Sequence, residues 1–249
     1  MRQRFLATAT GTIARAALMS AAVTIGSSML APSAWAIPFD LPSTACPACG
    51  GSISAHAVVT LDTNKLTVVL TNTGDPTSLS LGQLVSGFDI TFGTAIGSVS
   101  GLTQAGQLIT VSDKASGGVV TPINGNPDHW GAAVNASGTL FIATAGFGSA
   151  TANPQNMIIS GTASNTFPQD GLGNTNQQPY IQGHGTFTLT VNGLTSTTPI
   201  SSVSFEFGTG PEADIIVVPG PIVGAGLPGL VAACTGLVAL ARRRRKLVV

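Results

Sequence analysis

The feature that most constrains the fold of this 249-residue chain is a strict alternation of apolar and polar residues in several short segments. Phe187, Leu189 and Val191 alternate with threonines, and residues 203–207 and 88–92 repeat the pattern with phenylalanines. A period of two is the spacing of side chains on one face of a β-strand. Stretches that contain Gly and Pro separate these segments. We therefore expect an all-β body, an antiparallel β-sandwich of jelly-roll-like type.

One pair of neighbouring segments also predicts a specific hairpin. Residues 55–61 and 65–72 are rich in Val, Leu and Thr, and they flank the short turn-forming sequence Asp62-Thr63-Asn64. Two such runs joined by a few turn residues are typical of a β-hairpin. Shorter candidate strands lie at residues 107–112, 138–144 and 156–160.

The charged residues are few, 8% of the chain, and unevenly placed. Three arginines lie in the first fifteen residues and a cluster of five cations lies near the end. Lys65 and Lys114 are the only other cations, and all ten acidic residues lie between the two basic ends, so this middle region has a formal charge of −8. A protein that binds nucleic acid needs a basic patch against the phosphates. We therefore expect no nucleic-acid partner.

The amino-terminal end has the three parts of a secretory signal peptide. Arg2, Arg4 and Arg15 precede an uncharged apolar run at residues 16–30, and a small-x-small pair follows at Ala34 and Ala36. This order predicts export and cleavage after Ala36. The signal peptide would then be residues 1–36, and the alternative is an anchor that is not cleaved.

The carboxyl-terminal end predicts one transmembrane helix. Residues 222–241 form a 20-residue stretch without charge, long enough at about 1.5 Å per residue to cross a bilayer core of about 30 Å. A basic cluster follows, formed by Arg242, Arg243, Arg244, Arg245 and Lys246. Such a cluster stays on the cytoplasmic side. The exported body, residues 37–217, would lie outside the inner membrane and is long enough for one domain.

The junction between body and helix resembles a known sorting signal. Its motif is Val218, Pro219, Gly220 and Pro221, followed by the apolar segment and the arginines. These three parts in this order resemble the PEP-CTERM tail of exported proteins in Gram-negative bacteria that make exopolysaccharide. The family usually has Glu where this chain has Gly220. Residues 66–73, 84–88, 179–183 and 207–212 also resemble segments of exported proteins that carry this tail.

The resemblance implies a partner and a destination. The partner would be an exosortase, a membrane-embedded enzyme with a cysteine nucleophile. The tail at residues 218–249 would hold the protein in the inner membrane until it is processed. The body would then reach the cell surface or extracellular matrix, where exopolysaccharide is a further candidate partner. The alternative is a permanent single-span anchor.

Two cysteines near the start of the body predict a disulfide. Cys46 and Cys49 lie in Cys-Pro-Ala-Cys-Gly, which follows the signal peptide into an oxidising compartment. A thioredoxin-like redox pair would need a helix after a strand. Pro42, Pro47 and the Gly50-Gly51 pair argue against a helix, so we expect a structural disulfide that closes a tight loop.

The sequence contains no recognisable catalytic set. It lacks a G-x-S-x-G elbow, and the spacing of His56, His129 and His184 fits no metal site. We expect no enzyme activity, no metal and no cofactor. Trp130 and Tyr180 are the polar-tipped aromatic residues of the body, and they are candidates for glycan contact. The alternative is that both fill the edge of the core and hydrogen-bond locally.

Two functions of different class follow from these observations. The first is a structural or adhesive protein of the cell surface or extracellular matrix. The second is a carbohydrate-binding protein at the same place, and a glycan hydrolase is a less favoured variant of this second function. A third is a display scaffold whose Ser/Thr-rich surface carries glycans.

Overall fold

The computed structural model describes residues 35–77, 79–144, 154–161, 167, 171–173, 176–210 and 214–220. Several of the features predicted above lie outside this part of the chain. They are the signal peptide up to Ala34, Pro221 of the motif, the apolar segment 222–241 and the basic cluster 242–246.

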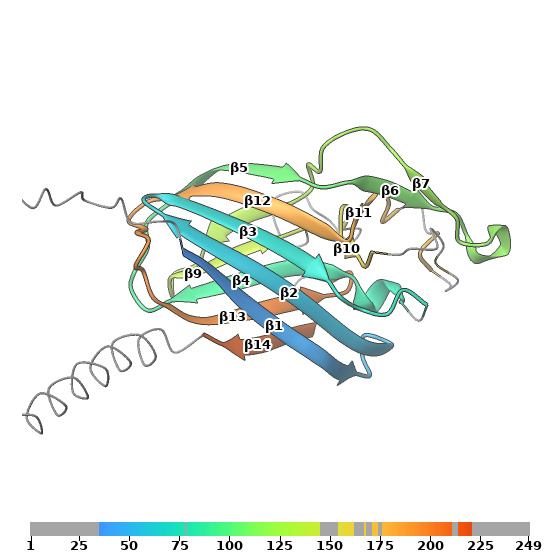
Figure 1. Ribbon diagram of the computed structural model, residues 1–249, viewed down its shortest axis with the longest axis horizontal. Helices are drawn as coiled ribbons and strands as arrows, with labels where there is room; N and C mark the ends of the chain where they lie inside the picture. The colour runs from blue at the N-terminus through green and yellow to red at the C-terminus, as the bar shows by residue number, and fades with distance from the viewer. Residues whose placement is uncertain are drawn as a thin grey trace, which may run out of the picture. The chain divides into compact units, whose positions relative to one another are not determined.

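The described residues form an all-β fold of two sheets, as the alternation predicts (Figure 1). The smaller sheet has the strand order β1-β2-β3-β12-β5. Its strands are β1 (Trp35–Cys46), β2 (Gly51–Asp62), β3 (Lys65–Asn72), β5 (Val99–Ala105) and β12 (His184–Val191). All of its pairs are antiparallel.

The larger sheet has nine strands, in the order β14-β13-β4-β10-β11-β6-β7, with β9 between β4 and β8. These strands are β4 (Val85–Phe92), β6 (Leu108–Val111), β7 (Val120–Pro122), β8 (Gly131–Val134), β9 (Thr139–Ala143), β10 (Ile158–Ile159), β11 (Tyr180–Gln182), β13 (Ile200–Phe207) and β14 (Asp214–Pro219). Two short 3₁₀ turns, η1 (Leu81–Gln83) and η2 (Lys114–Ser116), complete the described elements.

The predicted hairpin is confirmed as β2 and β3. Leu61 pairs with Leu66, and Asp62 pairs with Lys65 across the turn. Asn64 takes a φ of 54°, a left-handed conformation that Asn tolerates better than most residues. The turn also contacts a segment distant in the sequence: the amide of Asn64 donates to the carbonyl oxygen of Leu194 at 2.9 Å.

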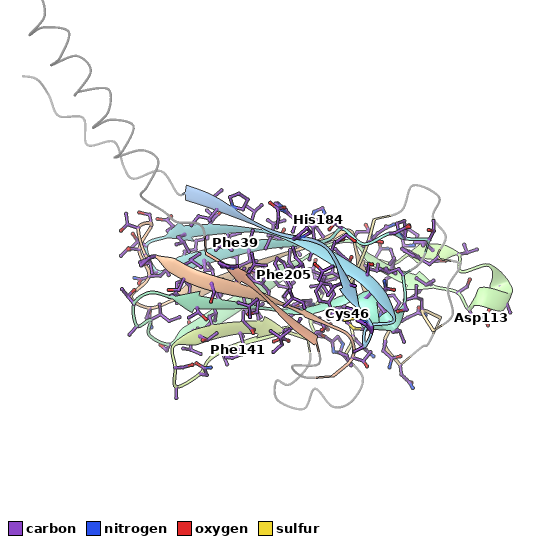
Figure 2. The ribbon with its side chains drawn as sticks, turned by 90° about the horizontal axis from the view of Figure 1, so that it is seen from below. Phe39, Cys46, Asp113, Phe141, His184 and Phe205 are labelled. Atoms are coloured by element: carbon purple, nitrogen blue, oxygen red, sulfur yellow. A yellow bond between two sulfur atoms is a disulfide. The ribbon has the colours of Figure 1, made fainter. Side chains whose placement is uncertain are left out.

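The main core lies between the two sheets and takes its residues from the apolar face of each strand. Phe187, Leu189 and Val191 of β12 are buried, and so is Phe205 of β13 (Figure 2). The rings of Phe205 and Phe88 meet across β13 and β4, with centroids 5.1 Å apart. In β12 the period of two in the sequence is also the period of burial, whereas the first six residues of β4 are all buried.

A second apolar cluster covers the opposite face of the larger sheet at β6, β10 and β11. Ile158 faces the main core, whereas Met157 and Ile159 face this second cluster. Tyr180 and Phe167 also belong to it and are fully buried. These strands are buried on both faces, which explains why residues 157–159 and 108–109 show apolar runs without alternation.

Candidate functional site

The last described strand contains Val218 and Pro219, the first two residues of the predicted sorting motif. β14 pairs antiparallel with β13, with Val203 opposite Val218 and Ser202 opposite Pro219. The amide of Gly220 then donates to the carbonyl oxygen of Ser201 at 2.9 Å. The sequence predicts a body that ends at residue 217, yet the sheet continues through Pro219. The motif therefore starts inside the larger sheet and not in a linker after it.

The close packing at Gly220 gives a physical reason for glycine at this position of the motif. A Cβ atom on Gly220 would overlap the carbonyl oxygen of Ile200 and would lie 2.8 Å from that of Ser201. Both obstacles are backbone atoms, which cannot rotate away as a side chain can. A glutamate here, the usual residue of the family that the tail resembles, would force the end of β14 away from β13.

β14 is an edge strand of the larger sheet with one face in solvent. Val217 is 61% exposed and Ile215 is 40% exposed. Ile216 and Val218 alternate with them and pack against the main core. Pro219 lies at the end of the strand, a position where the missing amide of proline is tolerated. Within the described residues β14 is paired with β13 alone, and it also contacts β1, which lies beside it (Figure 1).

The predicted signal-cleavage site lies at the start of the smaller sheet. Ala36 pairs with Thr60 in the hairpin of β1 and β2, and Ile37 pairs with Val59. Ala34 lies outside the described residues. Cleavage after Ala36 would leave Ile37 as the first residue of a strand that stays paired along β2.

The structure contains the disulfide between Cys46 and Cys49. It closes the turn between β1 and β2, with a Cα–Cα distance of 5.2 Å. Both cysteines are buried, and the amide of Cys49 donates to the carbonyl oxygen of Cys46 at 3.0 Å. The hydroxyl of Ser80 donates to the carbonyl oxygen of Cys49 at 3.1 Å. The disulfide therefore fixes a tight turn, and it lies between two strands and not at the start of a helix.

Trp130 does not form part of an exposed glycan platform. Its side chain is 4% exposed and its ring packs on Phe187, with centroids 4.4 Å apart. The indole Nε1–H donates to the carbonyl oxygen of Asn156 at 2.8 Å. The amide side chain of Gln104 holds the backbone of Trp130 through two hydrogen bonds, of 2.8 Å to the carbonyl oxygen and 3.2 Å from the amide.

Tyr180 is likewise buried, in the second apolar cluster. It is fully inaccessible, and its hydroxyl donates to the carbonyl oxygen of Leu172 at 3.0 Å. Burial raises the pKa of this phenol because the ionised form would lose its hydration. The suggestion that Trp130 and Tyr180 contact glycans is therefore corrected, since both rings are packed inside the fold and their polar atoms are bonded to backbone carbonyls.

The three histidines lie apart from one another: His56 is half-buried, and His129 and His184 are exposed. His56 Nδ1 lies 2.7 Å from Asp40 Oδ1 across β2 and β1, and His129 Nε2 lies 3.4 Å from Asp128 Oδ1. His184 is exposed on β12 (Figure 2). Within the described residues, no group of three or more His, Cys, Asp or Glu side chains could hold a metal ion.

Two carboxylates are buried where the sequence pattern predicts exposed ones. The alternation placed Asp89 and Glu206 on solvent faces, yet they are only 6% and 3% exposed. They lie on neighbouring strands, because Asp89 pairs with Ser204 and Glu206 pairs with Gly87. A Cβ atom on Gly87 would overlap the carboxylate of Glu206. A glycine inside a strand can mark such a close approach, and it is the one signal that could have revealed this site.

Buried amide side chains form a second feature that the sequence did not reveal. Asn72 donates through Nδ2 to the carbonyl oxygens of Gln83 and Ile158, at 3.0 and 2.9 Å. Gln83 in turn donates to the carbonyl oxygen of Ser52 at 2.6 Å. These bonds tie β3, η1, β2 and β10 together. Their role is structural, because each satisfies buried backbone groups.

The comparisons with known proteins give no relative. No family model, no curated protein and no solved structure matches this chain. Among the residues that the structure describes, there is no helix long and apolar enough to cross a membrane; the segment that we expect to do so, residues 222–241, lies outside them.

Proposed function

We propose that this is an exported structural or adhesive protein of the cell surface or extracellular matrix, sorted through its carboxyl-terminal tail by an exosortase-type enzyme. The observation that carries the proposal is the order of three parts in the sequence. The motif from Val218 to Pro221, an apolar segment of membrane length and five cations follow one another at the end of the chain. The proposal rests on the resemblance of this tail to PEP-CTERM tails.

The body supports this assignment by its chemistry. It is rich in β-structure and poor in cations, and several strands carry half-buried or exposed Thr side chains on the face opposite their core residues. We further propose that the two sheets form a jelly-roll-like sandwich, since β12 enters the smaller sheet between β3 and β5 from far along the chain. Such sandwiches serve many exported proteins as rigid modules. The carbohydrate-binding alternative loses its basis with the burial of Trp130 and Tyr180.

The proposed processing step breaks one peptide bond near the motif. A cysteine thiolate of the enzyme attacks the carbonyl carbon, and the body becomes a thioester on that cysteine. The tail leaves with a new amino group that takes up a proton. Water, or an amine of an acceptor molecule, then attacks the thioester and releases the body. Before this step the apolar segment holds the protein in the inner membrane, with the basic cluster in the cytoplasm.

Variants of the tail test the proposal in a strain that has a working exosortase. Replacement of Pro219 and Pro221 by Ala is expected to leave a full-length, membrane-bound form. Replacement of the four arginines at 242–245 by Ser is expected to let the tail slip into the membrane or beyond it, since those charges hold it on the cytoplasmic side. Immunoblots of membrane and surface fractions measure both effects. Unchanged surface delivery of all variants would contradict the sorting role.

A further inference from the structure

The proposed sorting motif overlaps the end of β14. The same backbone therefore cannot pair with β13 and be bound by a processing enzyme at the same time. A protease or transpeptidase binds an extended backbone and needs access to the carbonyl carbon that it attacks. In the folded body, the backbone from Ile216 to Gly220 is paired with β13. We propose that the processing enzyme acts on the chain only while β14 is released from β13. This inference rests on the proposed function and specifies the form of the protein that is the substrate.

The register shows which backbone groups are occupied. Gly220 donates to Ser201, and the pairs along an antiparallel ladder alternate between hydrogen-bonded and non-bonded positions. Val218 opposite Val203 and Ile216 opposite Phe205 therefore fall at bonded positions. The motif has two amides, on Val218 and Gly220, among its three described residues, and both point toward β13. The third described residue, Pro219, lies at a non-bonded position and has no amide hydrogen that an enzyme could bind.

The pairing of this end of the chain with β13 requires glycine at position 220. Because a Cβ atom there would overlap the carbonyl oxygen of Ile200, only glycine allows the strand to stay paired to its last residue. The residue at which this chain departs from the usual motif is thus the residue that the sheet requires to be small. The sheet would require glycine at position 220, whereas the usual motif has glutamate there.

The contacts that hold β14 on β13 are few enough for the strand to separate. Among the described residues β14 pairs with β13 alone and also contacts β1, and its two inward side chains, Ile216 and Val218, are only partly buried. Edge strands with few buried contacts are the elements that open most readily in native proteins. Release of β14 would leave the β12, β3 and β4 parts of the core intact. The body can therefore present the motif without unfolding as a whole.

A disulfide lock tests the inference without touching the motif. Ser204 and Val217 are directly opposite each other at a non-bonded position, where Cα atoms lie about 4.5 Å apart, within disulfide range. The double variant Ser204→Cys with Val217→Cys should tether β14 to β13 in the oxidising compartment. We expect full-length chain to accumulate in cells with the enzyme and to be processed after a reductant is added.

The control is a second disulfide of the same kind on the same sheet. Thr91 and Thr139 are opposite each other on β4 and β9, and their hydroxyl oxygens lie 3.3 Å apart. The amide of Thr144 donates to Ser86 at 2.8 Å, which sets Thr91 and Thr139 at a non-bonded position as well. The double variant Thr91→Cys with Thr139→Cys leaves β14 free and should be processed like the wild type.

A second pair of variants loosens the strand instead of locking it. Ile216→Ser removes a side chain that packs on the core, whereas Val217→Ser changes the neighbouring side chain that faces solvent. The Ile216→Ser chain should be processed several times faster than the wild type, and the Val217→Ser chain at the wild-type rate. Hydrogen exchange of the full chain should show slow amides at Val218 and Gly220 in the wild type and amides roughly five- to tenfold faster in Ile216→Ser, because this variant loses part of the apolar packing that holds β14.

The outcomes separate this inference from the proposed function. Processing of the locked chain at the wild-type rate would overturn the inference and leave the sorting function standing. A wild-type chain that stays uncleaved in the presence of an active enzyme would overturn the sorting function, and the inference with it. Arrest of the locked chain alone, together with release by reductant, supports both.

Discussion

The two-faced character of β13 can be tested by removing one ring. Phe205 is fully buried and its ring meets that of Phe88 at 5.1 Å. Truncation of a buried Phe to Ala typically costs about 3–5 kcal/mol, of which an aromatic pair contributes roughly 0.5–1.5 kcal/mol. A domain has only about 5–15 kcal/mol of net stability. The variant Phe205→Ala should therefore lose about a fifth or more of the unfolding free energy of the body.

The assay is urea unfolding of a body that comprises residues 37–220. Its single tryptophan, Trp130, lies in the main core and reports the transition by fluorescence. The matched control is Ser204→Ala, one residue along the same strand on the other face, which should change the unfolding free energy by no more than about 0.5 kcal/mol. Equal losses for Phe205→Ala and Ser204→Ala would refute the idea that the alternation sets burial.

Three further predictions follow from the geometry of the sheets and of the buried aromatic residues. A body that ends at Val217 should unfold at lower urea than one that ends at Gly220, because it lacks the last pairs of β14 with β13; the midpoints of the two curves measure the difference. Gln104→Ala should shift the fluorescence of Trp130 to longer wavelength and reduce stability by about 1–3 kcal/mol, since two hydrogen bonds to the Trp130 backbone are lost. Tyr180 has a raised pKa in the fold, so its contribution to stability should be constant up to a pH of about 10 and should fall above it as the unfolded phenol ionises; an absorbance titration of this single tyrosine should show no tyrosinate until the body unfolds.

The sequence predicted the positions of the strands in which apolar residues alternate with polar ones. β12, β13, the hairpin of β2 and β3, and β4 all lie where the alternation places them, because their apolar sets face one core. The pattern could not show whether the second face of a strand is covered. Asp89 and Glu206 are therefore buried against expectation, since burial there depends on segments far away in the sequence.

The candidate site shows a related limit. The apolar, β-branched run at residues 215–218 indicates a strand, but the resemblance of residues 218–221 to a sorting motif set the end of the body at residue 217. Only the pairing with β13 and the approach of Gly220 to Ile200 show that the strand and the motif overlap. Such contacts join residues that no local pattern connects. The sequence likewise does not show whether Trp130 and Tyr180 are buried, because the same residue types occur in cores and on exposed binding surfaces.

The most direct test of the proposed sorting is the carboxyl-terminal peptide of the protein at the cell surface. Mass spectrometry of surface-released protein, from a strain with a working exosortase, identifies where each copy ends. We predict that these copies end near the motif at residues 218–221 and lack residues 222–249, while an exosortase-deficient strain keeps them in the membrane fraction. Intact peptides from residues 242–249 on most surface copies of the exosortase-positive strain would contradict the account and would indicate a permanent anchor.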